Sequence, residues 1–203
     1  PQDVIELLGF LGDAEEHQQV RAIPGTGTHV PVWLLGSSLY GAQLAAHLGL
    51  PYAFASHFAP AMLEEAITIY RHNFQPSKYL AKPYLIVAAG VCAADTDEEA
   101  QFLRSSQLLA FARLRTGSPG KLPEPVRDLE QHIPPAVLAQ VKQALSCSAT
   151  GSESSIKDQL KGLIETYQPD ELMITGMIHD SAARIASFEI AARVLTELQS
   201  DAA

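Results

Sequence analysis

Residues 32–51 read Val-Trp-Leu-Leu-Gly-Ser-Ser-Leu-Tyr-Gly-Ala-Gln-Leu-Ala-Ala-His-Leu-Gly-Leu-Pro, and this stretch decides the predicted fold. Its first four residues form an apolar run too short for a helix, which predicts a buried strand that ends at Gly36. From Leu39 the apolar residues recur at helical spacing until Gly49, which suits a left-handed helix cap. Because a second apolar run follows at residues 50–58, the stretch predicts a strand, a turn, a helix and a parallel strand.

The turn between this strand and helix is a candidate anion site. Ser37 and Ser38 stand where the helix begins, and the first backbone N–H groups of a helix lack partners and lie at the positive end of its dipole. Two hydroxyls and small neighbours would let a phosphate approach closely. The commoner role of such a serine is a helix N-cap, and the turn alone leaves that alternative open.

Two further apolar runs extend the predicted sheet to four strands. Strands are expected near residues 31–35, 51–57, 84–94 and 171–177, all parallel because no hairpin sequence separates them. The run from Tyr84 to Ala89 is apolar at every position, as in a sheet covered on both faces. Helices are predicted at residues 3–11, 39–48, 61–73, 98–115, 135–145, 156–167 and 181–198, and a polar turn at 146–155. This is a parallel α/β protein, and four units leave either an open sheet or half a barrel.

The composition indicates one sizeable domain. The chain has 203 residues, of which 47% are hydrophobic, and a formal net charge of −9. That charge argues against a nucleic acid or an anionic membrane surface as a partner. Cys92 and Cys147 form no Cys-x-x-Cys pair, which favours two core thiols in a reducing compartment. The longest apolar run, residues 85–94, is too short to span a bilayer, so we expect no membrane partner.

Two polar groups follow predicted strands and invite a functional interpretation. The acidic residues between 95 and 99 could be an acid–base cluster, but they fall in the first turn of the predicted helix 98–115, where negative charge is stabilised. Helix capping is the favoured interpretation. Ser56, His57 and Phe58 end the second strand, at the edge where α/β folds place ligands.

Three stretches resemble the luciferase-like, flavin-dependent monooxygenases, which are (β/α)8 TIM barrels that bind reduced FMN. Residues 30–40, 48–60 and 170–180 resemble the fifth, sixth and eighth strands of that barrel with the residues that follow them, and residues 83–95 resemble the seventh. No stretch resembles the first four strands. The resemblance therefore implies that residues 1–203 form a single domain, the C-terminal half of a barrel, with an insertion at about residues 116–150.

The resemblance also implies roles for individual residues, with the flavin phosphate at the turn after the fifth strand. His57 would be catalytic, and its alternative role is that of a hydrogen-bonded structural histidine. No metal site is expected. The implied cofactor-binding residues are Gly36, Ser37, Ser38, Leu39, Tyr40 and Ser56, and the implied substrate-pocket residues are Phe58, Met177 and His179.

The activity implied by the resemblance is oxygen activation at reduced FMN, with one atom of molecular oxygen inserted into a small organic substrate. The cofactor supplies the difficult chemistry, and a separate flavin reductase supplies reduced FMN. We expect the protein in the cytoplasm. We also expect a homo-oligomer, because the open edges of half a barrel need to be covered by another chain. Two alternatives remain: a non-catalytic half-barrel that binds flavin or phosphate as a structural subunit, and a stand-alone open sheet that binds another phosphate ligand.

Overall fold

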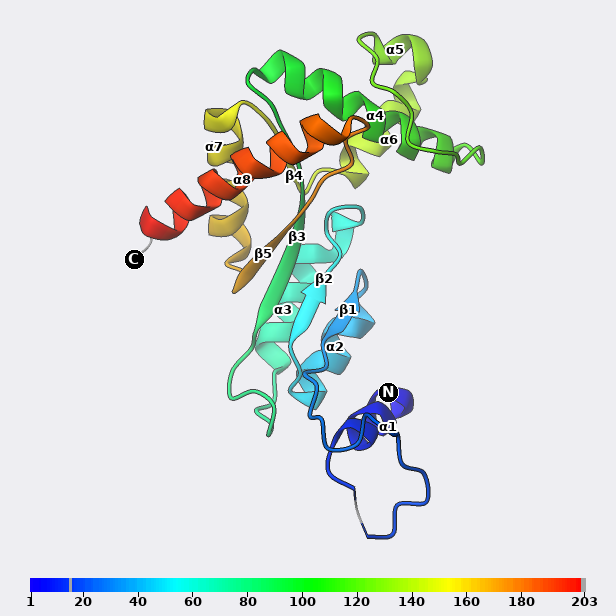
Figure 1. The fold of residues 1–203 in the computed structure, drawn as a ribbon, viewed down its shortest axis with the longest axis vertical. Coiled ribbons are helices and arrows are strands. Elements are labelled where there is room, and N and C mark those ends of the chain that lie inside the picture. The colour runs from blue at the N-terminus through cyan, green and yellow to red at the C-terminus, as the bar shows by residue number, and fades with distance from the viewer. Residues whose placement is uncertain (15, 202–203) are drawn as a thin grey trace.

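The computed structural model describes residues 1–14 and 16–201. The molecule is elongated: the strands run through its middle, α1 lies at one end, and α4, α5 and α6 lie at the other (Figure 1). In chain order the elements are α1 (Gln2–Leu11), β1 (Leu34–Gly36), α2 (Leu39–Leu48), β2 (Tyr52–Phe54), the short 3-10 helix η1 (Pro60–Met62), α3 (Leu63–Asn73), β3 (Leu85–Ala93), α4 (Asp97–Arg115), α5 (Leu129–His132), α6 (Pro135–Ala144), β4 (Ser148–Gly151), α7 (Glu153–Tyr167), β5 (Glu171–Thr175) and α8 (Ser181–Asp201).

The strands form one parallel sheet. β1 pairs with β2, β2 with β3, and β3 with both β4 and β5, and every one of these pairs is parallel. The predicted parallel α/β fold is confirmed. The predicted polar turn at residues 146–155 is wrong, because residues 148–151 form β4 and α7 begins at Glu153. The polar sequence of residues 148–151 gives no strand signal, and they form β4 because they pair with Gly90–Ala93 of β3.

β2 and β4 lie end to end along the same edge of β3. β2 pairs with Leu85–Val87 and β4 with Gly90–Ala93, while β5 pairs with Ile86–Gly90 and so overlaps both stretches. Because a strand has only two edges, β5 occupies one edge, and β2 and β4 share the other. Ala88 therefore falls at a gap between two partner strands.

One face of the sheet is covered by helices and the other is partly open. Tyr52, Leu85 and Val87 pack against α2 and α3 in a buried cluster. Every residue of β3 is buried, as its apolar run predicts. On the opposite face, Leu35 of β1 is 72% exposed and Met173 of β5 is 53% exposed. The prediction that β1 is a buried strand is therefore wrong for Leu35, because none of the described elements covers that position.

The helix α4 covers the carboxyl end of β3. Ala100 and Leu103 of α4 pack with Cys92, Ala94 and the buried Ile178. Thr96 caps α4, since its hydroxyl accepts a hydrogen bond from the Glu99 backbone N–H at 3.2 Å. As predicted, acidic residues of this segment lie in the first turn of α4, namely Asp97, Glu98 and Glu99. Asp97 serves a different helix: its carboxylate accepts hydrogen bonds from the Ser152 N–H and the Ser155 hydroxyl (3.0 Å) at the start of α7.

Asp97 is expected to make folding stability sensitive to acid. Hydrogen bonds from the Ser152 backbone N–H and then the Ser155 hydroxyl lower the pKa of Asp97. The stabilisation is complete above the unfolded pKa, about 3.8, and is lost as pH falls through the lower folded pKa. Between about pH 5 and pH 3, the melting temperature of Asp97→Asn should therefore fall less than that of the wild type. Asp158→Asn, which changes an exposed carboxylate of α7, should keep the wild-type profile, and equal acid sensitivity of all three proteins would contradict this role.

The remaining elements agree with the sequence to within a few residues, with one addition. The described chain contains the short helix α5, which the sequence did not predict. Residues 116–150 hold α5, α6 and most of β4, and their status as an insertion stays a prediction. Cys92 and Cys147 are both buried and unpaired with each other. Among the described helices, none has the length and apolar composition required to cross a membrane.

Candidate functional site

The turn after β1 is held by β2. The Ala55 N–H donates to the Gly36 carbonyl at 3.0 Å, so the two strands stay paired up to the turn. Tyr52 of β2 is fully buried below it and donates its hydroxyl to the Ser38 carbonyl at 3.3 Å. Burial raises the pKa of Tyr52 to about 12, so this hydroxyl remains a neutral donor at pH 7.

The helix α2 begins without a side-chain cap. Ser38 occupies the N-cap position with extended backbone angles, φ −133° and ψ 162°, yet its hydroxyl makes no capping hydrogen bond. The predicted alternative of a conventional serine cap is therefore wrong for Ser38, although the helix begins where predicted. Ser37 and Ser38 are both exposed, and Tyr40 is 57% exposed. Two serine side chains thus face solvent at the start of a helix, where the first N–H groups lack helical partners, and this arrangement suits a bound anion.

The turn after β2 contains one structural and two accessible side chains. Ser56 is fully buried, and its hydroxyl accepts from the Ala88 N–H at 3.1 Å and donates to the Ala88 carbonyl at 2.5 Å. It fills the gap between β2 and β4 along β3. Its predicted contact with a cofactor stays a prediction, and the structure assigns its hydroxyl to the backbone of Ala88.

His57 and Phe58 follow Ser56 on the same turn. The two rings pack edge to face with centroids 4.7 Å apart, and Phe58 is 44% exposed. Burial lowers the pKa of His57 below its usual value, so the imidazole is neutral at pH 7. Its Nδ1 is buried without a hydrogen-bond partner among the described residues. The alternative of a hydrogen-bonded structural histidine is thus not met at Nδ1, because a buried nitrogen without a partner is unusual in a structural role.

The segment after β5 is anchored around two predicted pocket residues. Ile178 is buried against α4, and the Asp180 carboxylate accepts from the Ala183 N–H at 2.8 Å at the start of α8. Met177 and His179 are exposed on either side of Ile178, with Met177 40% exposed. Because all strands are parallel, these residues share the carboxyl edge of the sheet with Ser37 and His57. They follow β5, which lies across β3 from β2.

A buried cation on α4 escaped sequence analysis. Arg104 is only 8% exposed, and its Nη2 donates to the Ser148 hydroxyl at 2.8 Å and the Leu145 carbonyl at 3.2 Å. Its Nη1 is buried with no partner among the described residues, and burial lowers the pKa of the guanidinium. The only sequence signal for its burial is its position between Leu103 and Leu108 in the predicted helix. An arginine at such a position could equally be exposed.

The described residues place no metal-binding cluster at this carboxyl edge, and a large cavity lies away from it. Within residues 1–14 and 16–201, no group of three or more histidine, cysteine, aspartate or glutamate side chains is placed to hold a metal ion. A cavity of about 660 Å³ lies instead at the amino ends of the strands. The predicted site is therefore a row of turns along one sheet edge.

Comparison with known proteins identifies the class that this fold and edge define. A family model for luciferase-like monooxygenases matches residues 9–167, and the chain belongs to that family. A protein of Escherichia coli (strain K12) named luciferase-like monooxygenase is 46% identical over 198 residues, which are 98% of this chain and 59% of that protein. The chain thus spans about three fifths of the length of this relative.

Solved structures agree on the fold. The crystal structure of apo-MsnO8 matches with a TM-score of 0.76 at 28% identity, over 96% of this chain and 60% of that one. The coenzyme F420-dependent tetrahydromethanopterin reductase of Methanopyrus kandleri matches with a TM-score of 0.50 at 10% identity, over 86% of this chain and 55% of that one, and shows the fold alone. The sheet is of the parallel type found in luciferase-like TIM barrels, so the predicted family and fold class are confirmed.

Proposed function

We propose that this chain is part of an FMN-dependent monooxygenase and that the turn after β1 binds the flavin phosphate. The observation that carries the proposal is the start of α2, where the Ser38 hydroxyl is exposed and makes no cap. Ser37 adds a second hydroxyl, and the N–H groups of Leu39 and Tyr40 belong to the first turn. Together they offer four donors to a phosphate at the positive end of a helix.

The residues after β2 and β5 would surround the reacting part of the ligand. Reduced flavin, when bound, supplies the electrons that place one atom of molecular oxygen in an organic substrate and the other in water. His57 is neutral at pH 7, so its imidazole ring can accept a proton from a reacting group. Phe58 and Met177 would provide apolar contacts for the substrate, and His179 a polar one.

The cellular context follows from the same proposal. A separate reductase would supply reduced flavin, and the protein would act in the cytoplasm as a homo-oligomer. The exposed faces of Leu35 and Met173 favour a second candidate function, a non-catalytic half-barrel that binds flavin within an assembly. Activity assayed with reduced FMN, oxygen and candidate substrates would distinguish the two.

The proposal predicts that the Ser37→Ala/Ser38→Ala double variant loses affinity for FMN. Each hydrogen bond to a charged phosphate contributes about 1.5–3 kcal/mol, so loss of two hydroxyls should lower affinity by about 100-fold or more. Riboflavin, which lacks the phosphate, should bind wild type and variant equally. Fluorescence titration would measure both, and coenzyme F420 would be titrated in parallel because a fold neighbour is named for it.

A matched control tests whether the effect is specific to the start of α2 or would arise at the start of another helix. Ser154 is an exposed serine in the first turn of α7, and Ser154→Ala should leave FMN affinity unchanged. Equal losses with Ser154→Ala, or unchanged FMN affinity in the double variant, would refute the assignment of the phosphate to α2.

A further inference from the structure

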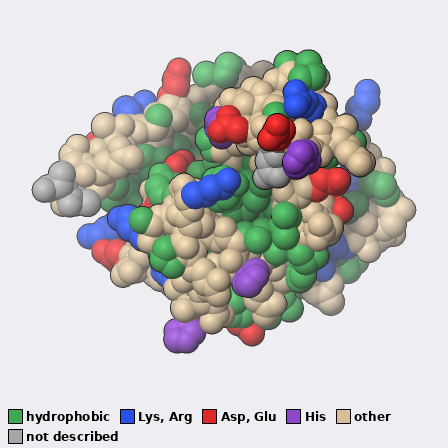
Figure 2. Space-filling model, turned by 90° about the horizontal axis from the view of Figure 1, so that it is seen from below, with side chains coloured by type: hydrophobic (Ala, Val, Ile, Leu, Met, Phe, Trp, Pro, Cys, Tyr) green, Lys and Arg blue, Asp and Glu red, His purple; other side chains and the backbone are tan. Residues whose placement is uncertain are grey.

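A cavity lies at the opposite end of the sheet from the proposed flavin site. It has a volume of about 660 Å³ and is bounded by α1 with residues 11–13, by residues 29–33, and by the loop between α3 and β3. Trp33, Pro51 and Tyr84, which line it, directly precede β1, β2 and β3. Figure 2 views the molecule from this end and shows hydrophobic side chains gathered near the middle of the face, with charged and histidine side chains around them.

The walls of this cavity are largely aromatic and aliphatic. Trp33 and Tyr84 pack edge to face with centroids 5.5 Å apart, and Tyr79 of the α3–β3 loop adds a third ring. Leu8 and Leu11 of α1 close the other side. A volume of this size, with apolar walls and few polar groups, is typical of a site for a small organic molecule.

Three of the four charged or histidine groups nearest these rings already have partners. The His29 Nε2 lies 3.0 Å from the Asp13 carboxylate, and the Glu171 carboxylate accepts from the Tyr84 hydroxyl at 2.8 Å. Lys78 differs: its Nζ lies 5.1 Å from the centre of the Tyr79 ring, and no described carboxylate is within ion-pair distance of it. Lys78 is therefore the one charged side chain of the described lining without a polar partner, and it lies beside an aromatic surface, while Asp13 and Glu171 keep their carboxylates engaged by His29 and Tyr84.

We propose that this cavity binds a small aromatic anion, with the ring system against Trp33, Tyr79 and Tyr84 and the anionic group at Lys78. This is a second site, separate from the proposed flavin phosphate site, because its residues precede the strands whereas Ser37 and His57 follow them. Lys78 supplies the charge that selects an anion, and the rings supply apolar contact and stacking.

The chain contains its own reporter for this site. Trp33 is the only tryptophan among the 203 residues, and it lines the cavity. The probe is 8-anilinonaphthalene-1-sulfonate, an aromatic sulfonate whose binding is followed by energy transfer from Trp33. Its uncharged counterpart, N-phenyl-1-naphthylamine, measures the contribution of the aromatic surface alone. We expect saturable energy transfer with the sulfonate.

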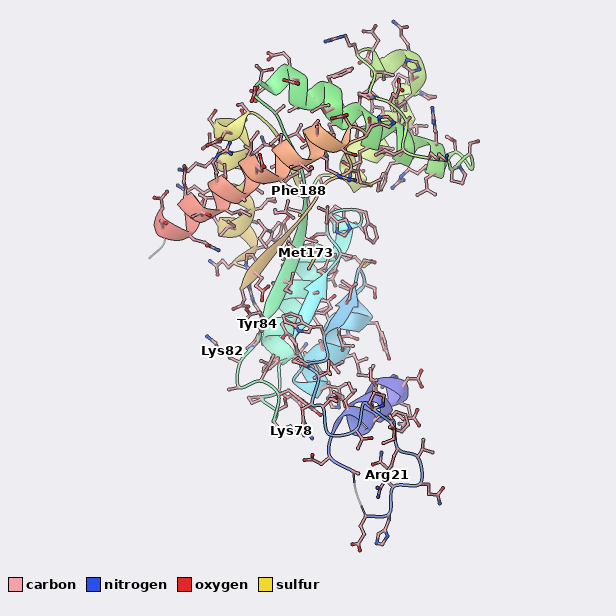
Figure 3. All side chains as sticks on the ribbon, viewed as in Figure 1. Arg21, Lys78, Lys82, Tyr84, Met173 and Phe188 are labelled. Atoms are coloured by element: carbon pink, nitrogen blue, oxygen red, sulfur yellow. The ribbon has the colours of Figure 1, made fainter. Side chains whose placement is uncertain are left out.

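Lysine variants test the charge. Lys82 lies on the same loop but does not line the cavity, and Figure 3 shows it projecting from the loop away from α1. Lys78→Met should weaken binding of the sulfonate about 3- to 5-fold, whereas Lys82→Met should change it less than 2-fold, as roughly expected for one exposed ion pair. The uncharged probe should bind both variants equally.

The outcomes also separate this site from the proposed flavin site. Saturating FMN, and the Ser37→Ala/Ser38→Ala change, should leave sulfonate binding unaltered. Equal affinities of Lys78→Met and Lys82→Met, or absence of energy transfer from Trp33, would each overturn the proposal. Either result would place the probe elsewhere, for example on the exposed face at Leu35 and Met173.

Discussion

Replacement of Gly49 by alanine is expected to lower the free energy of unfolding by about 3 kcal/mol. Gly49 ends α2 in the left-handed conformation, with φ 62° and ψ 39°. A Cβ at this position would lie 2.4 Å from the Gln75 carbonyl oxygen and 2.5 Å from the Ser77 Cβ. The cost therefore has two parts: left-handed backbone strain, about 1–2 kcal/mol, and displacement of the segment at Gln75 and Ser77, about 1–3 kcal/mol.

Gly117 is the matched control for the backbone part of this cost. Its φ is 76°, but no atom lies within 4 Å of a Cβ built on it. Gly117→Ala should therefore cost only about 1–2 kcal/mol. Urea denaturation of both variants and the wild type would give the difference. Equal costs would show that the contact with Gln75 and Ser77 yields freely, and that only the backbone conformation matters.

This glycine illustrates what the sequence could predict. Local signals set α2, which begins and ends where the apolar periodicity starts and Gly49 stops it. The nine buried residues of β3 were foreseeable, because an apolar run without alternation suits a strand covered on both faces. The start of α2 as a candidate anion site also follows from the sequence, since Ser37 and Ser38 stand between a strand and a helix.

Features that depend on distant partners could not be predicted. β4 has the sequence Ser-Ala-Thr-Gly and becomes a strand through its pairing with the far half of β3. The exposure of Leu35 depends on which face the helices cover. Arg104 and the cavity around Trp33 are assembled from segments far apart in the chain, so no local pattern marks them.

Ser56 shows how a predicted site residue acquires another role in three dimensions. It follows β2 at the edge where ligands bind, which is why the sequence pointed to the cofactor. In the fold its hydroxyl replaces a missing strand: β2 pairs with β3 up to Val87, β4 begins pairing at Gly90, and Ala88 between them bonds to Ser56 instead. The Ala88 N–H has no strand partner on that edge.

Ser56→Ala is therefore expected to lower the free energy of unfolding by about 2–3 kcal/mol, because the buried Ala88 N–H loses its acceptor. The Ala88 carbonyl keeps the Cys147 thiol, 3.5 Å away, as a weak donor. Ser106 is the matched control, since it is also fully buried but its hydroxyl has no partner among the described residues. Ser106→Ala should change stability by less than about 0.5 kcal/mol.

Denaturant titration of these two variants, combined with FMN titration well below their melting temperatures, separates the structural role from the predicted cofactor contact. A purely structural Ser56 predicts that Ser56→Ala is less stable but, while folded, keeps its FMN affinity within about 3-fold, unlike the Ser37→Ala/Ser38→Ala variant. If Ser56→Ala keeps wild-type stability and loses FMN affinity, the hydroxyl serves the cofactor and the bridge to Ala88 is dispensable. If Ser106→Ala is destabilised as strongly as Ser56→Ala, loss of packing at a buried serine explains both results. The hydrogen bonds between Ser56 and Ala88 would then contribute little to stability.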